Sequence, residues 1–154
     1  MATKWDTAHM KTAGVYAELS SARRAKVGCV IVKDNRIISI GYNGMPTGWD
    51  NNCEDEDWPS WARHREWDWI DPIYIHLTTK PEVLHAETNA IAKVARSSEN
   101  CEGATLYTTM APCLDCAKLI YQSGISKVFY NESYPKGVKG VDFLEKCEIP
   151  VEHI

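Results

Sequence analysis

Two short motifs combine residue types that bind a metal and move protons. The first is His85-Ala86-Glu87, and the second is Pro112-Cys113-Leu114-Asp115-Cys116. One imidazole and two thiolates make the three-ligand set of a catalytic zinc site, in which the fourth tetrahedral position is left to water. Zinc lowers the pKa of that water to about 7, so hydroxide becomes available at neutral pH. Glu87, two residues after the histidine, is the candidate for carrying protons between water and substrate.

The cysteine pair by itself is compatible with more than one kind of site. A CxxC pair that opens a helix in an α/β pattern is also typical of thioredoxin-like redox proteins, since a helix N-terminus favours the thiolate. H-x-E followed by P-C-x-x-C, however, is the signature of zinc deaminases, and Glu87 precedes Pro112 as that signature requires. The combination favours zinc-dependent hydrolysis. Two alternatives stay open: a thiol-disulfide oxidoreductase, and a zinc-stapled binding module without catalysis.

Hydrophobic periodicity predicts the elements that position the two motifs. An amphipathic helix is expected at residues 5–19, where one helical stripe carries Trp5, Ala8, Thr12, Val15, Tyr16 and Leu19. Two β-branched runs, at residues 27–32 and 36–42, predict a β-hairpin around Lys33-Asp34-Asn35. Further along, we expect helices at residues 85–95, 113–123 and 141–147, and strands at residues 104–108, 127–130 and 149–152.

These elements predict an α/β fold. Helices that alternate with strands in the second half imply parallel pairing through crossovers, whereas the first hairpin is antiparallel. We therefore expect a three-layer α/β/α sandwich with a mixed five-stranded sheet, in which both motif-bearing helices begin at the same end of the sheet. The length of 154 residues fits a single domain over residues 1–154, with an irregular Trp-rich insertion at about 49–80.

Composition and charge exclude several classes of function. A net charge of -4 and a pI near 5.7 give no overall electrostatic footprint for a polynucleotide, although they leave room for a local basic patch, so no nucleic-acid partner is expected. No apolar run approaches the ~20 residues of a membrane span, and the first residues lack the apolar stretch of a secretory signal. We therefore expect a cytoplasmic protein without membrane contact. Six cysteines in such a protein indicate reduced thiols and metal ligation rather than disulfides.

Several segments resemble the deoxycytidylate (dCMP) deaminase family of the cytidine-deaminase-like superfamily, most closely its phage and bacterial members. They are residues 27–32, 41–46, 85–91, 106–109 and 112–125, and they include the runs GYNG and QSGI. The resemblance implies hydrolytic deamination of dCMP to dUMP with release of ammonia, in pyrimidine deoxynucleotide synthesis. For a phage protein, the location is then the host cytoplasm. Deamination of another nucleoside or base stays an alternative, because the zinc motif fixes the reaction and the pocket fixes the substrate.

The resemblance also implies roles for individual residues. Zinc falls on His85, Cys113 and Cys116, and the proton shuttle on Glu87. The implied substrate contacts are Asn43 to the sugar or base, Arg24 to the phosphate, Tyr134 closing over the nucleotide, and Ala86. Some members carry a second, structural zinc, but its ligand positions fall here on Ala22, Asn52 and Thr78, with Cys53 and His76 as neighbours. We therefore predict one zinc per chain.

Regulation and assembly are further implications of the resemblance. It implies a homo-oligomer, a hexamer, that is activated by dCTP and inhibited by dTTP. Residues 41–48 and the Trp-rich insertion offer flexible backbone, stacking faces and cations to such a triphosphate, which would bring Mg²⁺ with it. The effector contacts expected there are Tyr42, Asn43, Gly44, Arg63 and Arg65.

Overall fold

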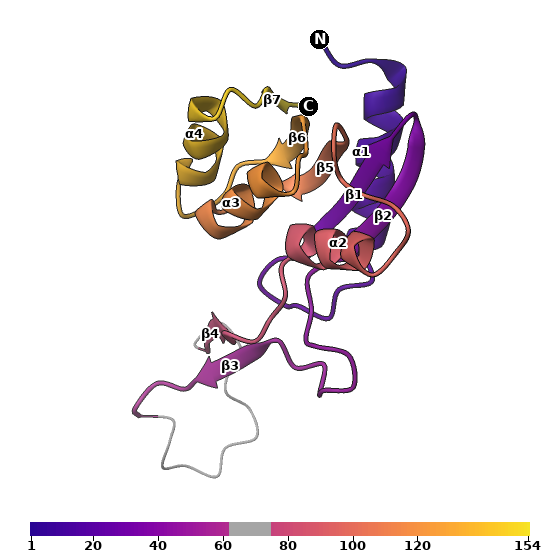
Figure 1. Cartoon of the computed structure of the whole chain (residues 1–154). Coiled ribbons are helices and arrows are strands. Elements are labelled where there is room, and N and C mark those ends of the chain that lie inside the picture. The colour runs from indigo at the N-terminus through magenta and orange to yellow at the C-terminus, as the bar shows by residue number, and fades with distance from the viewer. Residues whose placement is uncertain (62–74) are drawn as a thin grey trace.

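The computed structural model describes residues 1–61 and 75–154, and a five-stranded mixed sheet forms its centre (Figure 1). Across the sheet the order is β2 (Arg36–Tyr42), β1 (Gly28–Lys33), β5 (Thr105–Met110), β6 (Lys127–Glu132) and β7 (Val151–His153). β1 lies antiparallel to both β2 and β5, whereas β5, β6 and β7 run parallel to one another. The predicted mixed sheet, with an antiparallel hairpin followed by parallel crossovers, is confirmed.

Helices cover both faces of this sheet. α1 (Lys4–Ala17) packs on one face, and α2 (Ala86–Ala95), α3 (Leu114–Gln122) and α4 (Lys139–Lys146) lie on the other. The apolar core on the α1 side contains Met10, Ala13, Val30, Val32, Tyr107 and Phe129. The expected three-layer sandwich is therefore the observed architecture, and the element bounds differ from the expected ranges by only a residue or two. Within the described ranges, no helix combines the length and apolar composition needed to cross a membrane.

The stripe predicted for α1 faces solvent, so this expectation was wrong. Its large apolar members Trp5, Val15 and Leu19 are 53%, 62% and 59% exposed. The face against the sheet carries instead His9, Met10, Ala13 and Ala17. The cause is close packing, because a Cβ at Gly28 would lie only 1.9 Å from the carbonyl oxygen of Ala13. Only a residue without a Cβ at position 28 allows α1 to lie this close to β1. The spacing of large apolar residues does not reveal where such a contact forms.

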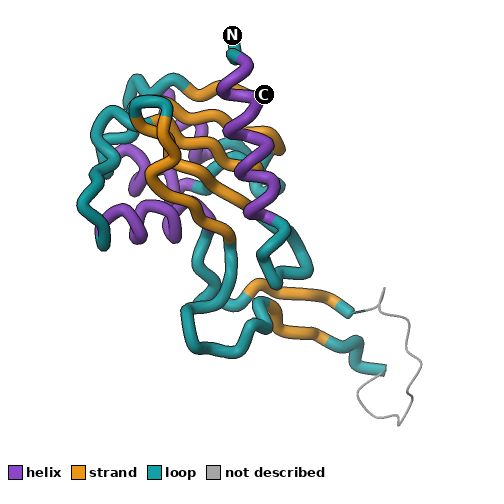
Figure 2. Tube along the Cα trace, turned by 90° about the vertical axis from the view of Figure 1, so that its right-hand side faces the viewer, coloured by secondary structure: helices purple, strands orange, loops and turns teal. Residues whose placement is uncertain are grey.

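The Trp-rich insertion contains a second, smaller sheet that the sequence pattern does not predict. β3 (Glu54–Asp57) and β4 (His76–Thr79) pair antiparallel, with Glu54 opposite Thr79. Acidic residues have low β-propensity, so the run EDED gives no strand signal. Figures 1 and 2 both show this hairpin projecting away from the central sheet. Trp67 and Trp69 of the insertion lie outside the described residues.

Candidate active site

The two chemical motifs meet because the helices that follow them begin at the same end of the sheet. His85 is the N-cap residue of α2 and Cys113 that of α3. Sγ of Cys113 accepts a hydrogen bond from the backbone N–H of Cys116 at 3.5 Å. α4 buttresses this turn, because a Cβ at Gly140 would lie 2.0 Å from the carbonyl oxygen of Pro112. The backbone of α4 therefore packs directly against the start of α3.

His85, Cys113 and Cys116 direct three donor atoms at one point. Nδ1 of His85 lies 3.5 Å from Sγ of Cys113 and 3.3 Å from Sγ of Cys116. Tetrahedral zinc, with Zn–N of about 2.0–2.1 Å and Zn–S of about 2.3 Å, sets N and S ligands about 3.6 Å apart. The donor set and its spacing therefore fit zinc. In the described part of the chain, this is the one group of His, Cys, Asp and Glu found with such spacing.

The two thiols behave as a pair that shares one proton. The hydrogen bond from Cys116 lowers the pKa of Cys113 to about 4, and the contact with His85 also lowers it. The same hydrogen bond raises the pKa of Cys116, and burial adds to that rise. A soft divalent cation bound by these residues would take the place of the shared proton, with both sulfurs as thiolates.

Glu87 lies in the first turn of α2, and its side chain is buried, with the residue only 4% exposed. Burial raises the pKa of its carboxyl, while a hydrogen bond from its own backbone N–H and the charge of His85 offset part of the rise. A raised carboxyl pKa brings the group closer to neutral pH, where it can both accept and donate protons. Glu87 therefore has the environment of a general acid and base rather than that of an exposed helix cap.

A cavity of about 320 Å³ opens beside these groups, which is within the size range of small-molecule sites. His85, Glu87 and Cys113 form part of its wall. The residues linked to substrate by resemblance line it as well: Arg24, Asn43, Ala86 and Tyr134. The structure therefore brings segments that are distant in the sequence to one cavity, with two of the three predicted metal ligands, His85 and Cys113, on its wall.

Asn43 is held by two hydrogen bonds to the segment that precedes β1. Its Oδ1 accepts from the N–H of Val27 at 2.8 Å, and its Nδ2 donates to the carbonyl oxygen of Ala25 at 2.8 Å. One Nδ2 hydrogen is left over for a ligand. Asn43 therefore fixes the cavity wall itself, which the sequence analysis did not foresee.

Arg24 and Tyr134 reach the cavity from different segments. Arg24 precedes β1, and its Nη1 donates to Oγ1 of Thr79 at 3.0 Å. Tyr134 follows β6, where burial raises the pKa of its hydroxyl and the negative charges of Cys113 and its neighbours add to the rise. The charge of Arg24 acts on the same hydroxyl in the opposite direction. Both Arg24 and the cysteine cluster therefore lie close enough to Tyr134 for their charges to affect the pKa of its hydroxyl.

The residues expected to bind an effector are described only in part. Tyr42 ends β2, and Nζ of Lys93 lies 5.7 Å from its ring centroid. Gly44 exchanges backbone hydrogen bonds with Leu84 at 3.1 and 2.8 Å, which ties this loop to the segment before α2. Two further residues expected at the effector site lie outside the described ranges: Arg63 and Arg65.

The positions associated with a second zinc make other interactions. Ala22 packs with Cys53 in a small apolar cluster. Oδ1 of Asn52 accepts hydrogen bonds, and the hydroxyl of Thr78 lies 3.4 Å from Nδ1 of His76. One zinc per chain stays a prediction, which metal analysis decides.

The cavity wall also contains residues that the sequence motifs did not predict, among them Glu54 and Thr79. They pair with each other across the β3–β4 hairpin. Glu54 is 1% exposed, although the other residues of the EDED run are exposed. Nothing in that run distinguishes one acid from the next, so only a signal for strand pairing could have identified it.

Comparison with known proteins extends the similarity beyond these motifs. Residues 3–132 match the family described as the cytidine and deoxycytidylate deaminase zinc-binding region. The deoxycytidylate deaminase of Enterobacteria phage T4 is 40% identical, over 76% of this chain and 72% of that protein. The human deoxycytidylate deaminase is 38% identical, over 82% of this chain and 64% of that protein.

Solved structures give the same result for the fold. The dCMP deaminase from the cyanophage S-TIM5, in complex with dCMP and dUMP, matches with a TM-score of 0.84 and 37% sequence identity. The match covers 100% of this chain and 99% of that chain. The similarity therefore includes the whole fold and is not confined to the two motifs.

Proposed function

The chain belongs to the deoxycytidylate deaminase family, and on this basis we propose that it hydrolyses dCMP to dUMP and ammonia. One observation supports the proposal above all: the buried Glu87 lines the same cavity as His85 and Cys113, which form the candidate zinc site together with Cys116. Replacing the amino group at C4 of cytosine requires an activated water molecule and a source of protons for the leaving group. The residues around this cavity offer both.

His85, Cys113 and Cys116 would hold the zinc ion. When bound, the ion lowers the pKa of water to about 7 and so supplies a nucleophile at neutral pH. The chain contributes the fixed geometry, because two N-cap positions carry the imidazole and one thiolate. The backbone N–H of Cys116 also donates to Sγ of Cys113, which favours the thiolate form.

Glu87 moves the protons. Its carboxylate accepts a proton from the attacking water and passes it to N3 of cytosine, while the water oxygen bonds to C4. A second proton travels by the same route to the amino group, the C4–N bond breaks, and ammonia leaves. Water and cytosine become uracil and ammonia, and Glu87 ends as the carboxylate with which it began. Its raised pKa suits a group that must accept and donate in turn.

In this proposal Arg24 recognises the phosphate, and Tyr134 closes over the nucleotide. A guanidinium matches a phosphate in charge and in the fork geometry of its donors. The hydroxyl of Tyr134 is a neutral donor at pH 7, and burial raises its pKa further. Asn43 and Ala86, on the cavity wall, then face the sugar or the base. This arrangement favours the monophosphate over the bare nucleoside.

The proposal extends to assembly and regulation. Residues 1–154 act as one deaminase domain, the active form is a homohexamer, and activity rises with dCTP and falls with dTTP, each bound with Mg²⁺. The family resemblance supports this, and Tyr42 beside Lys93 offers a ring and a cation to a second nucleotide. The exposed apolar residues of α1 offer a surface to another subunit. We place the enzyme in the cytoplasm, where charged nucleotides are retained.

An ammonia-release assay over a panel of substrates tests the proposal. Zinc-loaded protein is incubated separately with dCMP, deoxycytidine, cytidine, guanine and adenosine, and ammonia and products are measured. We expect dUMP and ammonia in equal amounts from dCMP, and slower turnover of the other compounds. Efficient turnover of another base instead would assign a different deaminase activity. Disulfide reduction without any ammonia release would favour the oxidoreductase alternative.

A further inference from the structure

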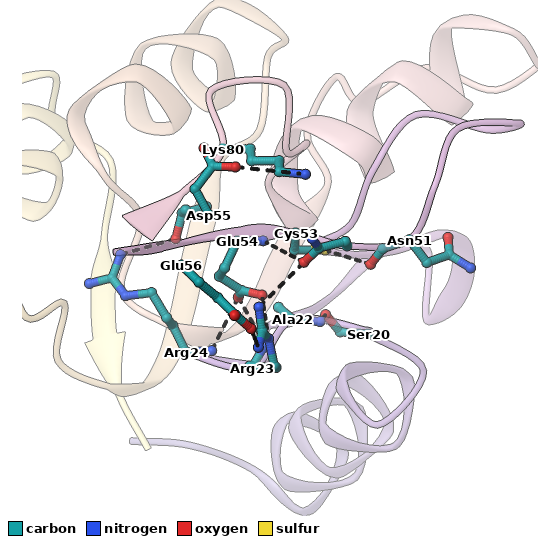
Figure 3. Close-up of polar contacts among 12 residues, drawn as sticks. Ser20, Ala22, Arg23, Arg24, Asn51, Cys53, Glu54, Asp55, Glu56 and Lys80 are labelled. Atoms are coloured by element: carbon teal, nitrogen blue, oxygen red, sulfur yellow. Dashed lines mark hydrogen bonds and ion pairs between the residues drawn. The ribbon is translucent and has the colours of Figure 1, made fainter. Parts of the chain in front are cut away.

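The β3–β4 hairpin holds Arg24 by both its main chain and its guanidinium (Figure 3). Glu54, the first residue of β3, pairs with Thr79, the last residue of β4, and we call this pair the Glu54–Thr79 rung. Oε1 of Glu54 accepts from the backbone N–H of Arg23 at 2.9 Å and from that of Arg24 at 3.2 Å. Oγ1 of Thr79 accepts from Nη1 of Arg24 at 3.0 Å. One rung therefore contacts both ends of this arginine.

Glu54 is almost completely buried, unlike the carboxylate of a typical surface ion pair. The residue is 1% exposed and lines the cavity. Oε1 takes both backbone hydrogen bonds, whereas Oε2 has an ion pair with Nε of Arg23 at 3.5 Å and no hydrogen bond from the part of the chain that the structure describes. Burial of a carboxylate is unfavourable unless charge-assisted hydrogen bonds compensate for it. Figure 3 shows the side chain running from β3 to the backbone of Arg23 and Arg24.

The segment that Glu54 holds has no regular structure of its own. Residues 21–27, between α1 and β1, form neither helix nor strand, and Arg24 is exposed. An arginine in an unsupported loop samples many rotamers, and a ligand that needs it must then order both loop and side chain. The Glu54–Thr79 rung imposes that order before the ligand arrives.

We infer that the Glu54–Thr79 rung is a positioning device that presents the guanidinium of Arg24 to the phosphate of the nucleotide. The identity of this ligand rests on the proposed function, whereas the contacts to Arg24 do not. Both residues act through Arg24 and are positioning residues. The inference also gives the Trp-rich insertion a role, because its two strands supply the rung.

Substitutions at Thr79 test the guanidinium contact. Thr79→Val removes the hydroxyl at similar volume, and Thr79→Ser keeps it. T79V should raise KM for dCMP about tenfold, the worth of one hydrogen bond to a charged group, with kcat nearly unchanged. T79S should match the wild type, and deoxycytidine, which lacks the phosphate, should be turned over equally by all three proteins. Addition of T79V to Arg24→Ala should have no further effect, because the rung acts through Arg24.

Glu54→Gln tests the backbone contact, and Glu56→Gln is its matched control. Glu56 lies on the same strand, and its ion pair, at 2.7 Å, goes to Nη1 of Arg23. In E54Q, the amide hydrogens of residues 23 and 24 should exchange with solvent about tenfold faster than in the wild type, and KM for dCMP should rise. In E56Q, neither should change. Exchange is measured without nucleotide, so it remains decisive if E54Q loses activity.

The outcomes separate this inference from the proposed function. Suppose that the wild type turns over dCMP, that T79V and E54Q match E56Q in KM, and that E54Q also matches E56Q in amide exchange. The inference is then wrong and the proposed function stands. If the wild type does not deaminate dCMP, the proposed function fails. Binding of inorganic phosphate then decides the inference: weaker binding by T79V than by T79S supports it, and equal binding overturns it. If E54Q does not fold, the comparison of T79V with T79S decides in the same way.

Discussion

Nδ1 of His85 lies 3.3 Å from Sγ of Cys116, although 31 residues separate the two in the chain. No single helix or strand holds both, and their proximity arises because α2 and α3 begin at the same end of the sheet. The candidate metal site is therefore a product of the tertiary fold. A metal bound there should in return stabilise the packing of the two helices.

Loss of one thiolate should remove the metal. The purified wild type should contain about one zinc per chain, and Cys113→Ala should contain almost none, since two ligands do not retain zinc tightly. Elemental analysis and a thermal melt measure both effects, and C113A should also melt at a lower temperature. Cys147→Ala, at the end of α4 and outside the donor set, serves as the control that keeps zinc. Two zinc ions per wild-type chain would contradict the single-site prediction.

Arg24→Ala should weaken the preference for the monophosphate. Removing a guanidinium that faces a phosphate should lower kcat/KM for dCMP about 10- to 100-fold, while turnover of deoxycytidine and zinc content stay the same. Arg36→Ala is the matched control, because Arg36 pairs with Glu99 at 3.3 Å outside the cavity wall. Equal turnover of dCMP and deoxycytidine by the wild type would count against this assignment.

The contact between α1 and β1 should be intolerant of one added carbon. A Cβ at Gly28 would lie 1.9 Å from the carbonyl oxygen of Ala13, so Gly28→Ala must displace the helix and should cost about 1–3 kcal/mol of unfolding free energy. Gly14→Ala is the control within α1, where a Cβ meets nothing within 4 Å. It should stabilise the protein by about 0.5–1 kcal/mol. Urea denaturation measures both, and similar stabilities for the two variants would refute this packing.

The hydrogen bond from Tyr107 to Asp6 should make stability depend on acid pH. Burial acts to raise the pKa of Asp6, but hydrogen bonds from Tyr107 and Thr3 outweigh it and lower that pKa below 3.8. Because the folded pKa is the lower one, this stabilisation is present above the unfolded value and is lost as pH falls through the folded value. The hydroxyl of Tyr107 donates to Oδ1 of Asp6 at 2.6 Å. Its removal in Tyr107→Phe should lower the free energy of unfolding by about 1 kcal/mol near neutral pH.

The difference between Y107F and the wild type should shrink below about pH 4. Urea denaturation of both proteins at several pH values measures it, and the comparison cancels any release of metal in acid. A difference that stays constant down to about pH 2 would show that Asp6 is not the partner that matters.

Features carried by local residue types could be predicted from the sequence. The reversal at Lys33-Asp34-Asn35 is one example, since Asp34 and Asn35 adopt left-handed φ values of 50° and 56°, which these residue types tolerate. The zinc-ligand candidates are another, because their types and order are specific. Neighbouring residues determine the turn, and each zinc motif can be identified from its own short segment, although only the tertiary fold brings the two motifs together.

Features set by tertiary packing could not be predicted in the same way. The buried face of α1 depends on the close approach of Gly28, and the burial of Glu54 depends on the pairing of β3 with β4. Neither leaves a periodic signal in the sequence. The hydrogen bonds of Asn43 to Ala25 and Val27 likewise exist only once the loop has closed.

The most direct test of the central claim is dCMP turnover by the wild type and by Glu87→Gln at matched zinc content. The amide cannot carry protons, so E87Q should fold and hold zinc but lose about 10²- to 10⁴-fold in kcat. Glu82→Gln, at an exposed position just before α2, should behave as the wild type. Formation of dUMP and ammonia by the wild type, with this loss in E87Q alone, is the predicted result. An E87Q variant that retains near-wild-type turnover would contradict the account.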